Sequence, residues 1–243
     1  MGLLRHTVRV APPPSEAPRL DSVGTMQLTH LGHSAVLVQT DGARILIDPG
    51  NFSDAWHGLT DLDAVLVTHR HPDHLDPAAL PALLAANPGA RVVVEPSILA
   101  ASEAGDLPPL PHASGLAPDD QTAVGDVLVT GVGGAHAVIH PDIPRIGNVG
   151  FVLRSEGQPT LFHPGDSYAV APGGVDILAV PLYGPWGALR ETIDFARAVA
   201  APEGFGIHDE LLNDRGRGLI TGRLAAMTPT RLVDLRGGQT HTF

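Results

Sequence analysis

Short apolar runs separated by turn-forming residues dominate the first half of the chain, and this pattern predicts β-strands. Residues 27–31, 34–40 and 43–47 are three such runs. Asp41 and Gly42 stand between the second and third runs, where an Asp-Gly pair favours a tight hairpin turn. We therefore expect these two runs to pair as antiparallel strands.

A buried strand followed by a helix is predicted next. Residues 64–68 are continuously apolar, which is typical of a strand covered on both faces. Asp76 is a good N-cap, Pro77 suits the first helical position, and residues 78–86 are rich in alanine and leucine. Asn87 and the Pro-Gly pair after it should end this helix.

The remainder of the chain repeats this alternation, apart from a proline-rich loop predicted at residues 105–120. Further strands are expected at residues 91–95, 126–132, 149–154, 160–163, 175–180, 204–207, 231–235 and 240–243, and helices at 97–103, 190–200 and 219–227. Strands in both halves with helices between them predict an α/β fold in which two sheets pack face to face with helices outside.

The length of 243 residues fits one domain of this class, which we place at residues 25–243. Residues 1–24 contain the run Pro12-Pro13-Pro14, which favours extended and solvated backbone. We expect this segment to be a flexible N-terminal extension.

The charge and the hydrophobic content limit the classes of function. Hydrophobic residues make up 43% of the chain, enough for a sizeable core. The formal net charge is -11, from 15 basic and 26 acidic side chains. An acidic surface repels phosphate backbones, so nucleic acid is not the expected partner.

The chain has no cysteine, so any metal ion must be held by histidine and carboxylate side chains. Residues 1–24 lack the apolar core of a signal peptide, and no apolar run approaches the roughly 20 residues that a membrane helix needs. We therefore expect a cytoplasmic protein that acts on a small molecule and does not bind a membrane.

The clearest chemical signal is the run His69-Arg70-His71-Pro72-Asp73-His74, directly after the apolar strand. His69 and His71 are two positions apart, so in extended backbone they project to the same side. Asp73 and His74 follow where the chain turns toward the helix. Four potential ligands in six residues point to a metal site rather than to a surface loop with spare histidines.

This run and its context resemble the metallo-β-lactamase superfamily, over about residues 26–235. The segments that carry the resemblance are residues 68–74, 31–34 (Leu-Gly-His-Ser), 45–49 (Ile-Leu-Ile-Asp-Pro), 133–136 (Gly-Gly-Ala-His), 162–167 (Phe-His-Pro-Gly-Asp-Ser) and 206–209 (Gly-Ile-His-Asp). The second and third of these resemble the branch that contains ascorbate-6-phosphate lactonase-like enzymes. The resemblance implies a four-layer αβ/βα sandwich with two metal ions in a cleft at one edge.

The resemblance also implies a set of ligands. Metal 1 would take His69, His71 and His136; metal 2 would take Asp73, His74 and His208; and Asp166 would bridge the two. The ions would be zinc, with manganese or iron as alternatives. A hydroxide held between two such cations is a nucleophile at neutral pH, and Asp73 would orient it as the catalytic carboxylate.

Other polar residues near these segments have two interpretations each. Asp48 would orient a ligand imidazole or simply form a turn, and His33 would lie near the site or be a buried histidine satisfied by backbone. His163 is expected behind the ligands. His140 is the rival of His136 for the third-ligand position; otherwise His140 and Asp142 would line the substrate pocket, together with Tyr183 and Trp186.

The implied function is hydrolysis of a small ester, lactone or phosphodiester. The main alternative is a redox or binding protein that uses the same metal-site scaffold without hydrolysis. Diiron relatives of the family place a glutamate where His71 stands, so the second histidine favours hydrolysis. A nuclease is disfavoured by the acidic balance, and a β-lactamase by the closer resemblance to the lactonase-like branch.

Overall fold

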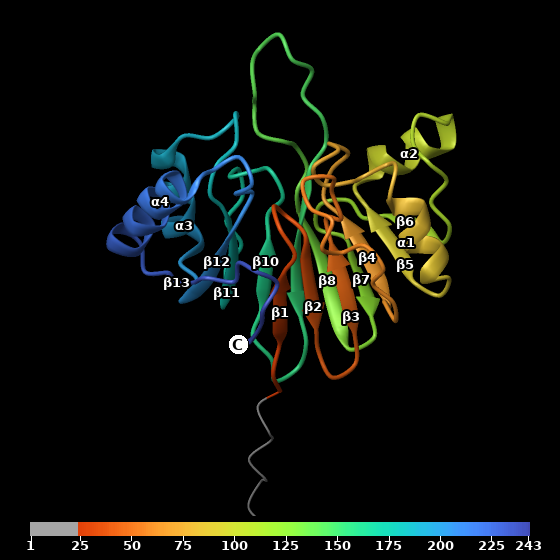
Figure 1. Ribbon diagram of the computed structural model, residues 1–243, viewed down its shortest axis with the longest axis horizontal. Coiled ribbons are helices and arrows are strands. Elements are labelled where there is room, and N and C mark those ends of the chain that lie inside the picture. Colours follow the sequence, from red (N-terminus) through yellow and green to blue (C-terminus); the bar gives the residue numbers. More distant parts are fainter. Residues whose placement is uncertain (1–23) are drawn as a thin grey trace, which may run out of the picture.

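Two seven-stranded sheets pack face to face, and helices cover their outer faces (Figure 1). The computed structural model describes residues 24–243, so the expected N-terminal extension lies, except for Gly24, outside the described residues. The α/β sandwich predicted from the sequence is confirmed. In the part of the chain described here, no helix combines the length and hydrophobicity required to cross a bilayer.

The first sheet has the strand order β14-β1-β2-β3-β4-β5-β6. Its strands are β1 (Gln27–His30), β2 (Val36–Gln39), β3 (Arg44–Ile47), β4 (Ala64–Val67), β5 (Arg91–Val94), β6 (Ala113–Gly115) and β14 (Thr240–Thr242), and its helices are α1 (Leu80–Ala86) and α2 (Pro96–Ala104). The predicted hairpin is present, because β2 and β3 pair antiparallel. Strands β3 to β6 run parallel to one another.

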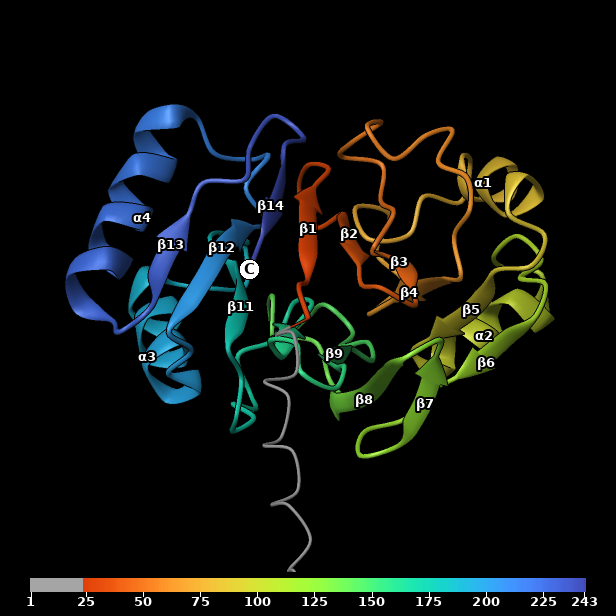
Figure 2. The ribbon, with the colours of Figure 1, turned by 90° about the horizontal axis from the view of Figure 1, so that it is seen from below.

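The second sheet has the order β13-β12-β11-β10-β9-β8-β7. Its strands are β7 (Gln121–Val124), β8 (Val127–Gly133), β9 (Val149–Arg154), β10 (Leu161–His163), β11 (Ile177–Pro181), β12 (Glu203–Ile207) and β13 (Arg231–Val233), and its helices are α3 (Leu189–Val199) and α4 (Asp214–Met227). Figure 2 shows the two helix pairs at opposite ends of the molecule.

The layers follow from the two-residue period of the strands. In β3, Ile45 and Ile47 face the second sheet, whereas Leu46 faces the helices of its own sheet. Strand β4 alternates in the same way, so both faces of the central strands are buried. This double burial explains why these segments are continuous apolar runs in the sequence.

The structure corrects several predicted boundaries. Helix α1 begins at Leu80 rather than 78, although the Asp76 carboxylate still accepts a hydrogen bond from the Ala78 amide at 2.8 Å. Strand β6 lies inside the predicted loop, and β7 was not predicted. Helix α4 begins at Asp214 rather than at 219. Gly216 and Gly218 lower the helical propensity of its first turn, so the sequence pattern did not predict this turn, although the Asn213 side chain caps it.

The segments with candidate ligands all follow the carboxyl ends of strands at one edge of the sandwich. They come after β1, β3, β4, β8, β10 and β12. Because these strands point the same way within their sheets, their loops converge. Ligand sites in α/β folds gather at such strand ends for this reason.

One close backbone approach brings two of these loops together. A Cβ atom on Gly50 would lie 1.8 Å from the carbonyl oxygen of Asp73. The Asn51 amide, next in sequence, donates to the Pro72 carbonyl at 2.8 Å. Only glycine at position 50 lets the loop after β3 support the loop that carries the histidine run.

We expect Gly50→Ala to displace the loop of Asp73, because backbone cannot move aside as a flexible side chain does. Overpacking of this kind costs about 1–3 kcal/mol or more of unfolding free energy. Chemical denaturation with and without added metal would measure both the stability and the metal-linked gain. Gly89→Ala is the matched control, because no atom lies within 4 Å of the position that its methyl group would take, and equal stability of the two variants would contradict the prediction.

Candidate functional site

Two groups of side chains at the loop edge have the composition of metal sites. One group is His69, His71, His136 and Asp166, and the other is His33, Asp73, His74 and His208. Within each group the potential ligand atoms all lie within 4.8 Å of one another. The structure therefore brings together all seven residues predicted as ligands, and it adds His33.

The backbone is held in an unusual conformation at three residues in and beside these groups. His33, Asp48 and His208 have φ angles of 51°, 50° and 55°. Positive φ is uncommon for residues other than glycine and is concentrated at functional sites. Each of the three lies shortly after the end of a strand, where the turn directs its side chain toward the cluster.

Three of the histidines each donate a hydrogen bond from Nδ1 to a group that can only accept. These pairs are His74 with the Asp48 carboxylate (2.7 Å), His136 with the carbonyl of Ala137 (2.7 Å) and His208 with the carbonyl of Tyr183. In the neutral ring, a proton on Nδ1 leaves a lone pair on Nε2. All three Nε2 atoms are therefore acceptors in the neutral state.

These Nε2 atoms converge on one carboxylate. They lie 3.0 Å (His208), 3.3 Å (His136) and 3.1 Å (His74) from the oxygens of Asp166. Nε2 of His74, Nε2 of His136 and Oδ1 of Asp166 are buried and have no hydrogen-bond partner. Lone pairs facing a buried carboxylate repel it, whereas a divalent cation between them satisfies both. The donor set therefore fits bound metal.

His69 and His71 complete the first group. Nδ1 of His69 lies 3.0 Å from the hydroxyl oxygen of Thr68, and its Nε2 lies 3.1 Å from Nδ1 of His71. Burial lowers the pKa of His69 well below its ordinary value, and burial also lowers the pKa of His71. Both rings are therefore neutral at pH 7, which is the state that binds a metal ion.

His33 acts on Asp73. Its Nε2 donates to Oδ2 of Asp73 at 3.0 Å. Burial alone would raise the pKa of Asp73, but this hydrogen bond and the nearby charge of His74 outweigh it and lower the pKa to about 2. Asp73 is thus ionised at neutral pH. The sequence left the role of His33 open, and the structure places it in the cluster.

Asp48 is the support behind His74. Its buried carboxylate accepts from the amide of Thr68 at 2.8 Å, from the hydroxyl of Thr68 at 2.7 Å and from Nδ1 of His74 at 2.7 Å. This is the geometry by which a carboxylate orients a ligand imidazole. His163 lies further back, with Nδ1 3.9 Å from Asp48 and Nε2 3.0 Å from the carbonyl oxygen of Ser34.

Trp186 closes the site from the second sheet. Its indole N–H donates to Oδ2 of Asp166 at 2.9 Å. Its ring also lies edge-on to His136 and His208. The sequence predicted Trp186 as a pocket residue, but nothing in the sequence indicated the hydrogen bond to Asp166, which requires the loop after β11 to fold back over β10.

The side chains of three other predicted pocket residues do not line the site. His140 and Asp142 face each other at 3.6 Å on the loop of residues 134–148, with side chains 60% and 90% exposed. This loop projects beyond the body of the protein (Figure 1), so its tip does not reach the ligands. Tyr183 contributes its carbonyl to His208, while its ring is exposed. None of the three lines the cleft described next.

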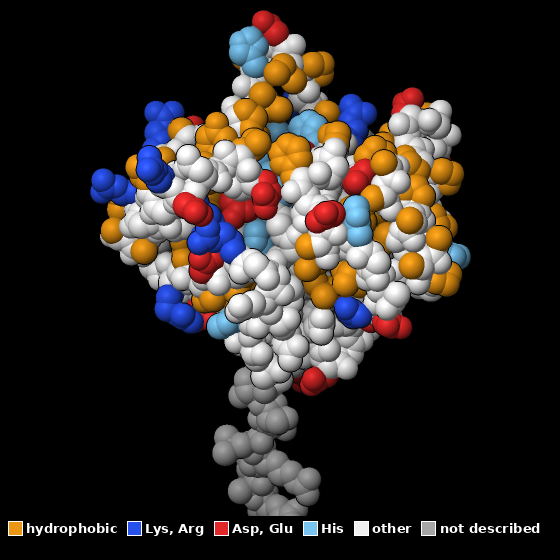
Figure 3. All heavy atoms as spheres, in the orientation of Figure 1, with side chains coloured by type: hydrophobic (Ala, Val, Ile, Leu, Met, Phe, Trp, Pro, Cys, Tyr) orange, Lys and Arg blue, Asp and Glu red, His pale blue; other side chains and the backbone are white. Residues whose placement is uncertain are grey.

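The cluster forms the floor of an open cleft of about 500 Å³. Asp73, Asp166, His71, His136 and His208 are exposed to it, and its walls are Asn51, Phe52, Pro72, Ile139, Pro185, Trp186 and Leu211. Figure 3 shows hydrophobic side chains with histidine between them at the base of the projecting loop. A volume of this size suits a small molecule.

A family model described as "Beta-lactamase superfamily domain" matches residues 27–202, which is more than half of the chain. The chain belongs to the beta-lactamase superfamily. The match includes every ligand candidate except His208, which lies beyond its end.

Several individual proteins are similar to this chain. "Protein Rv0786c" of Mycobacterium tuberculosis (strain ATCC 25618 / H37Rv) is 41% identical over 206 residues, covering 84% of this chain and 94% of the relative. A "UPF0173 metal-dependent hydrolase" of Anaeromyxobacter sp. (strain K) is 32% identical over 164 residues, covering 59% of this chain and 57% of that relative. The "metallo-beta-lactamase fold protein YhfI" of Bacillus subtilis has a TM-score of 0.68 at 18% identity, covering 90% of this chain and 100% of that one, which shows the fold alone.

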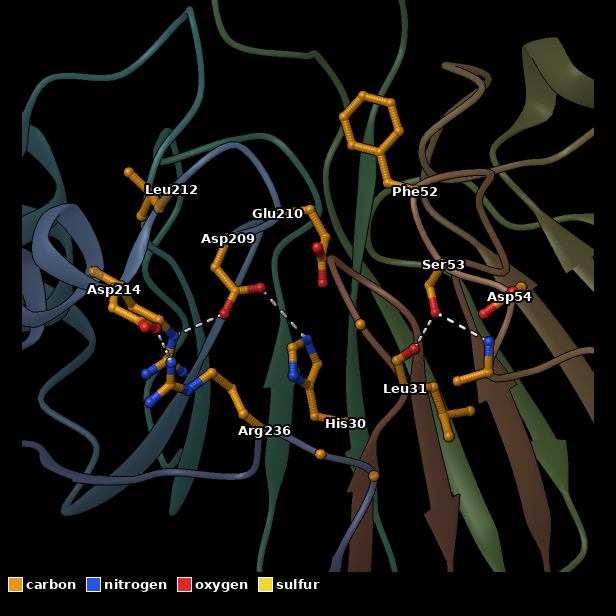
Figure 4. Close-up of a pocket in the computed structure, with 15 residues that line it drawn as sticks. His30, Leu31, Phe52, Ser53, Asp54, Asp209, Glu210, Leu212, Asp214 and Arg236 are labelled. Atoms are coloured by element: carbon orange, nitrogen blue, oxygen red, sulfur yellow. Dashed lines mark hydrogen bonds and ion pairs between the residues drawn. The ribbon is translucent and has the colours of Figure 1, made fainter.

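The protein has a second cavity, of about 530 Å³, beside the loop that carries His208 (Figure 4). It is polar where the cleft is apolar. Asp209 points into its wall toward His30, and Arg217 donates from Nε to Asp209 at 2.8 Å. Because Asp209 and Arg217 are both buried, this ion pair anchors the residue next to a candidate ligand.

We expect Asp48→Asn to lower metal affinity by about 10–100-fold, because the amide supports the His74 ring less well than a carboxylate does. Asparagine tolerates positive φ, so the backbone at position 48 stays unstrained. Competition with a chromogenic chelator would measure the affinity. Asp61→Asn is the control, since Asp61 is exposed and also has positive φ, at 60°; a similar loss in both variants would contradict the role given to Asp48.

We expect Arg217→Met to cost about 3–5 kcal/mol of unfolding free energy, because it leaves the Asp209 carboxylate buried without its partner. Metal affinity should fall as well, since His208 precedes Asp209. Urea unfolding and metal titration would test the two effects. Arg215→Met, an exposed change on the same helix, should leave both quantities unchanged; unaltered stability of the Arg217 variant would refute the anchoring role.

Proposed function

We propose that the protein is a metal-dependent hydrolase that cleaves a small ester, lactone or phosphodiester with two divalent metal ions, zinc in the first instance and manganese or iron as alternatives. The observation that carries this proposal is the convergence of three histidine Nε2 atoms on the buried carboxylate of Asp166, each from a ring whose Nδ1 already donates to another acceptor. The name "metal-dependent hydrolase" that several relatives bear supports the same class.

The two groups of side chains suggest how the ions would be shared. His69, His71 and His136 would hold one ion, and Asp73, His74 and His208 the other, with Asp166 between them. His33 already donates to Asp73, so we assign it a positioning role rather than a place among the ligands. The ligand set that the resemblance to the superfamily implies supports this division.

When bound, the ions would supply a nucleophilic hydroxide at neutral pH and stabilise the negative charge that develops on the substrate. Asp73 lines the cleft and is ionised, so its carboxylate would accept a hydrogen bond from the attacking hydroxide and orient it. His33 holds that carboxylate in place. Trp186 fixes Asp166 and excludes water from one side of the cleft.

The replacements His71→Ala and Asp73→Ala should each abolish hydrolysis and reduce bound metal, because each removes a ligand from one of the two groups. Elemental analysis of the purified variants, together with assays on esters, lactones and phosphodiesters after addition of zinc or manganese, measures both effects. Removing metal from the unaltered protein with a chelator should stop turnover, and adding metal back should restore it.

His140→Ala and Asp142→Ala are matched controls, because these residues are of the same types but lie exposed on the projecting loop. Both should keep full metal content and full activity. Turnover retained in either ligand variant would overturn the proposal. A fully metallated protein that hydrolyses no substrate of the three classes would favour a redox or binding role.

A further inference from the structure

The cleft is divided sharply between a polar floor and apolar walls. Among the residues that line it, every charged or imidazole side chain belongs to the candidate metal cluster. The amide of Asn51 is the one remaining polar side chain in this lining. Once the cluster is occupied by metal, the cleft offers a substrate little beyond apolar surface and the ions themselves.

No arginine lines the cleft in the part of the chain that the structure describes, and the chain has no lysine at all. Arg145, which lies on the projecting loop, donates from Nε to the carbonyl of His136 and lines smaller neighbouring cavities. Arg145 shares one of these cavities with His71 and His136, but it does not line the cleft. A second anionic group of a substrate, such as the phosphate of a sugar phosphate, would therefore find no side-chain cation within the cleft itself.

Apolar side chains are exposed at this opening to an unusual degree. Phe52 is 41% exposed and Leu211 is 54% exposed, although both line the cleft. Ile139, which comes from the projecting loop, also lines the cleft, as do Pro185 and Trp186. Exposed apolar surface around a cavity that ends on reactive groups is typical of a ligand-binding groove.

We propose that the substrate is an uncharged ester or lactone with an apolar acyl or aryl group, and that Phe52, Ile139 and Leu211 select it. This inference rests on the proposed hydrolytic function, which it narrows. The carbonyl lies at the metal cluster, and the apolar group lies along the wall between the projecting loop and the loop of residues 208–212. Trp186 lies between the metal cluster and the apolar wall, because its N–H donates to Asp166 while its ring lines the cleft.

A series of p-nitrophenyl esters from acetate to octanoate tests the apolar wall directly. We expect kcat/KM to rise by about threefold for each added methylene until the wall is filled, mainly through a lower KM, as partial burial of each CH2 predicts. Esters of the same length that end in a carboxylate, and bis(p-nitrophenyl) phosphate, should be poor substrates. An equal rate across the series, or a preference for the charged members, would overturn the inference.

The variants Ile139→Ser and Leu211→Ser should flatten this dependence on chain length, because they should lower kcat/KM for the octanoate by a larger factor than for the acetate. Leu219→Ser is the matched control, since Leu219 is 59% exposed but lies on α4, outside the cleft. Leu211→Arg should raise kcat/KM for the esters that end in a carboxylate. A chain-length dependence that survives both serine variants would show that other residues select the substrate.

A binding measurement separates this inference from the proposed function. Trp186 becomes the sole tryptophan in Trp56→Phe, and its fluorescence should respond to alkyl methyl ketones, which cannot be hydrolysed. Affinity should rise from butan-2-one to decan-2-one by a similar factor per methylene. Tighter binding of longer ketones without hydrolysis of any ester would refute the proposed function and support the apolar site. Hydrolysis of esters without a rise in ketone affinity with chain length would refute the apolar site. A change in Trp186 fluorescence with lipid vesicles but not with ketones would refute it as well.

Discussion

The buried carboxylate of Asp166 is the constraint on which the rest of the site depends. Four histidines turn Nε2 toward it, and three of them donate a hydrogen bond from Nδ1 to a fixed acceptor. Protonated histidines alone do not account for this arrangement. The carboxylates of Asp166 and Asp48 raise the pKa of His74 against the effect of its burial, but burial lowers the pKa of His69 well below its ordinary value. Bound cations reconcile the geometry with electrostatics, and the surrounding structure is organised to keep that geometry fixed.

The fold provides this rigidity through strand ends rather than through a single loop. The ligands come from both sheets, so the cluster forms only when the sheets pack, and the apolar core between them sets its dimensions. Asp48 shows how the support works, because one carboxylate ties the end of β4 at Thr68 to the ring of His74. The close approach of Gly50 to Asp73 adds a second tie between the same loops.

The sequence was informative where spacing and strand ends decide the outcome. The fold class and the buried strand before His69 were predicted, and the residues that converge were the predicted ones. The hydrogen-bond partners of His33 and Trp186 were beyond reach, because these contacts join residues 40 and 20 positions apart in the sequence. The start of α4 was predicted wrongly for a local reason. Two glycines in its first turns made the pattern look non-helical, although Asn213 caps this turn and Arg217 within it is buried.

The distribution of positive charge links the metal cluster to the choice of substrate. All 15 basic residues are arginines, and none of those in the described chain lines the cleft. In the proposed function, the ions would then provide both the reactive centre and the strongest attraction for a polar group. Affinity for the rest of a substrate would come from the apolar walls, where it grows with buried area and not with charge. This is the physical basis for proposing substrates that combine one polarised carbonyl with an apolar substituent.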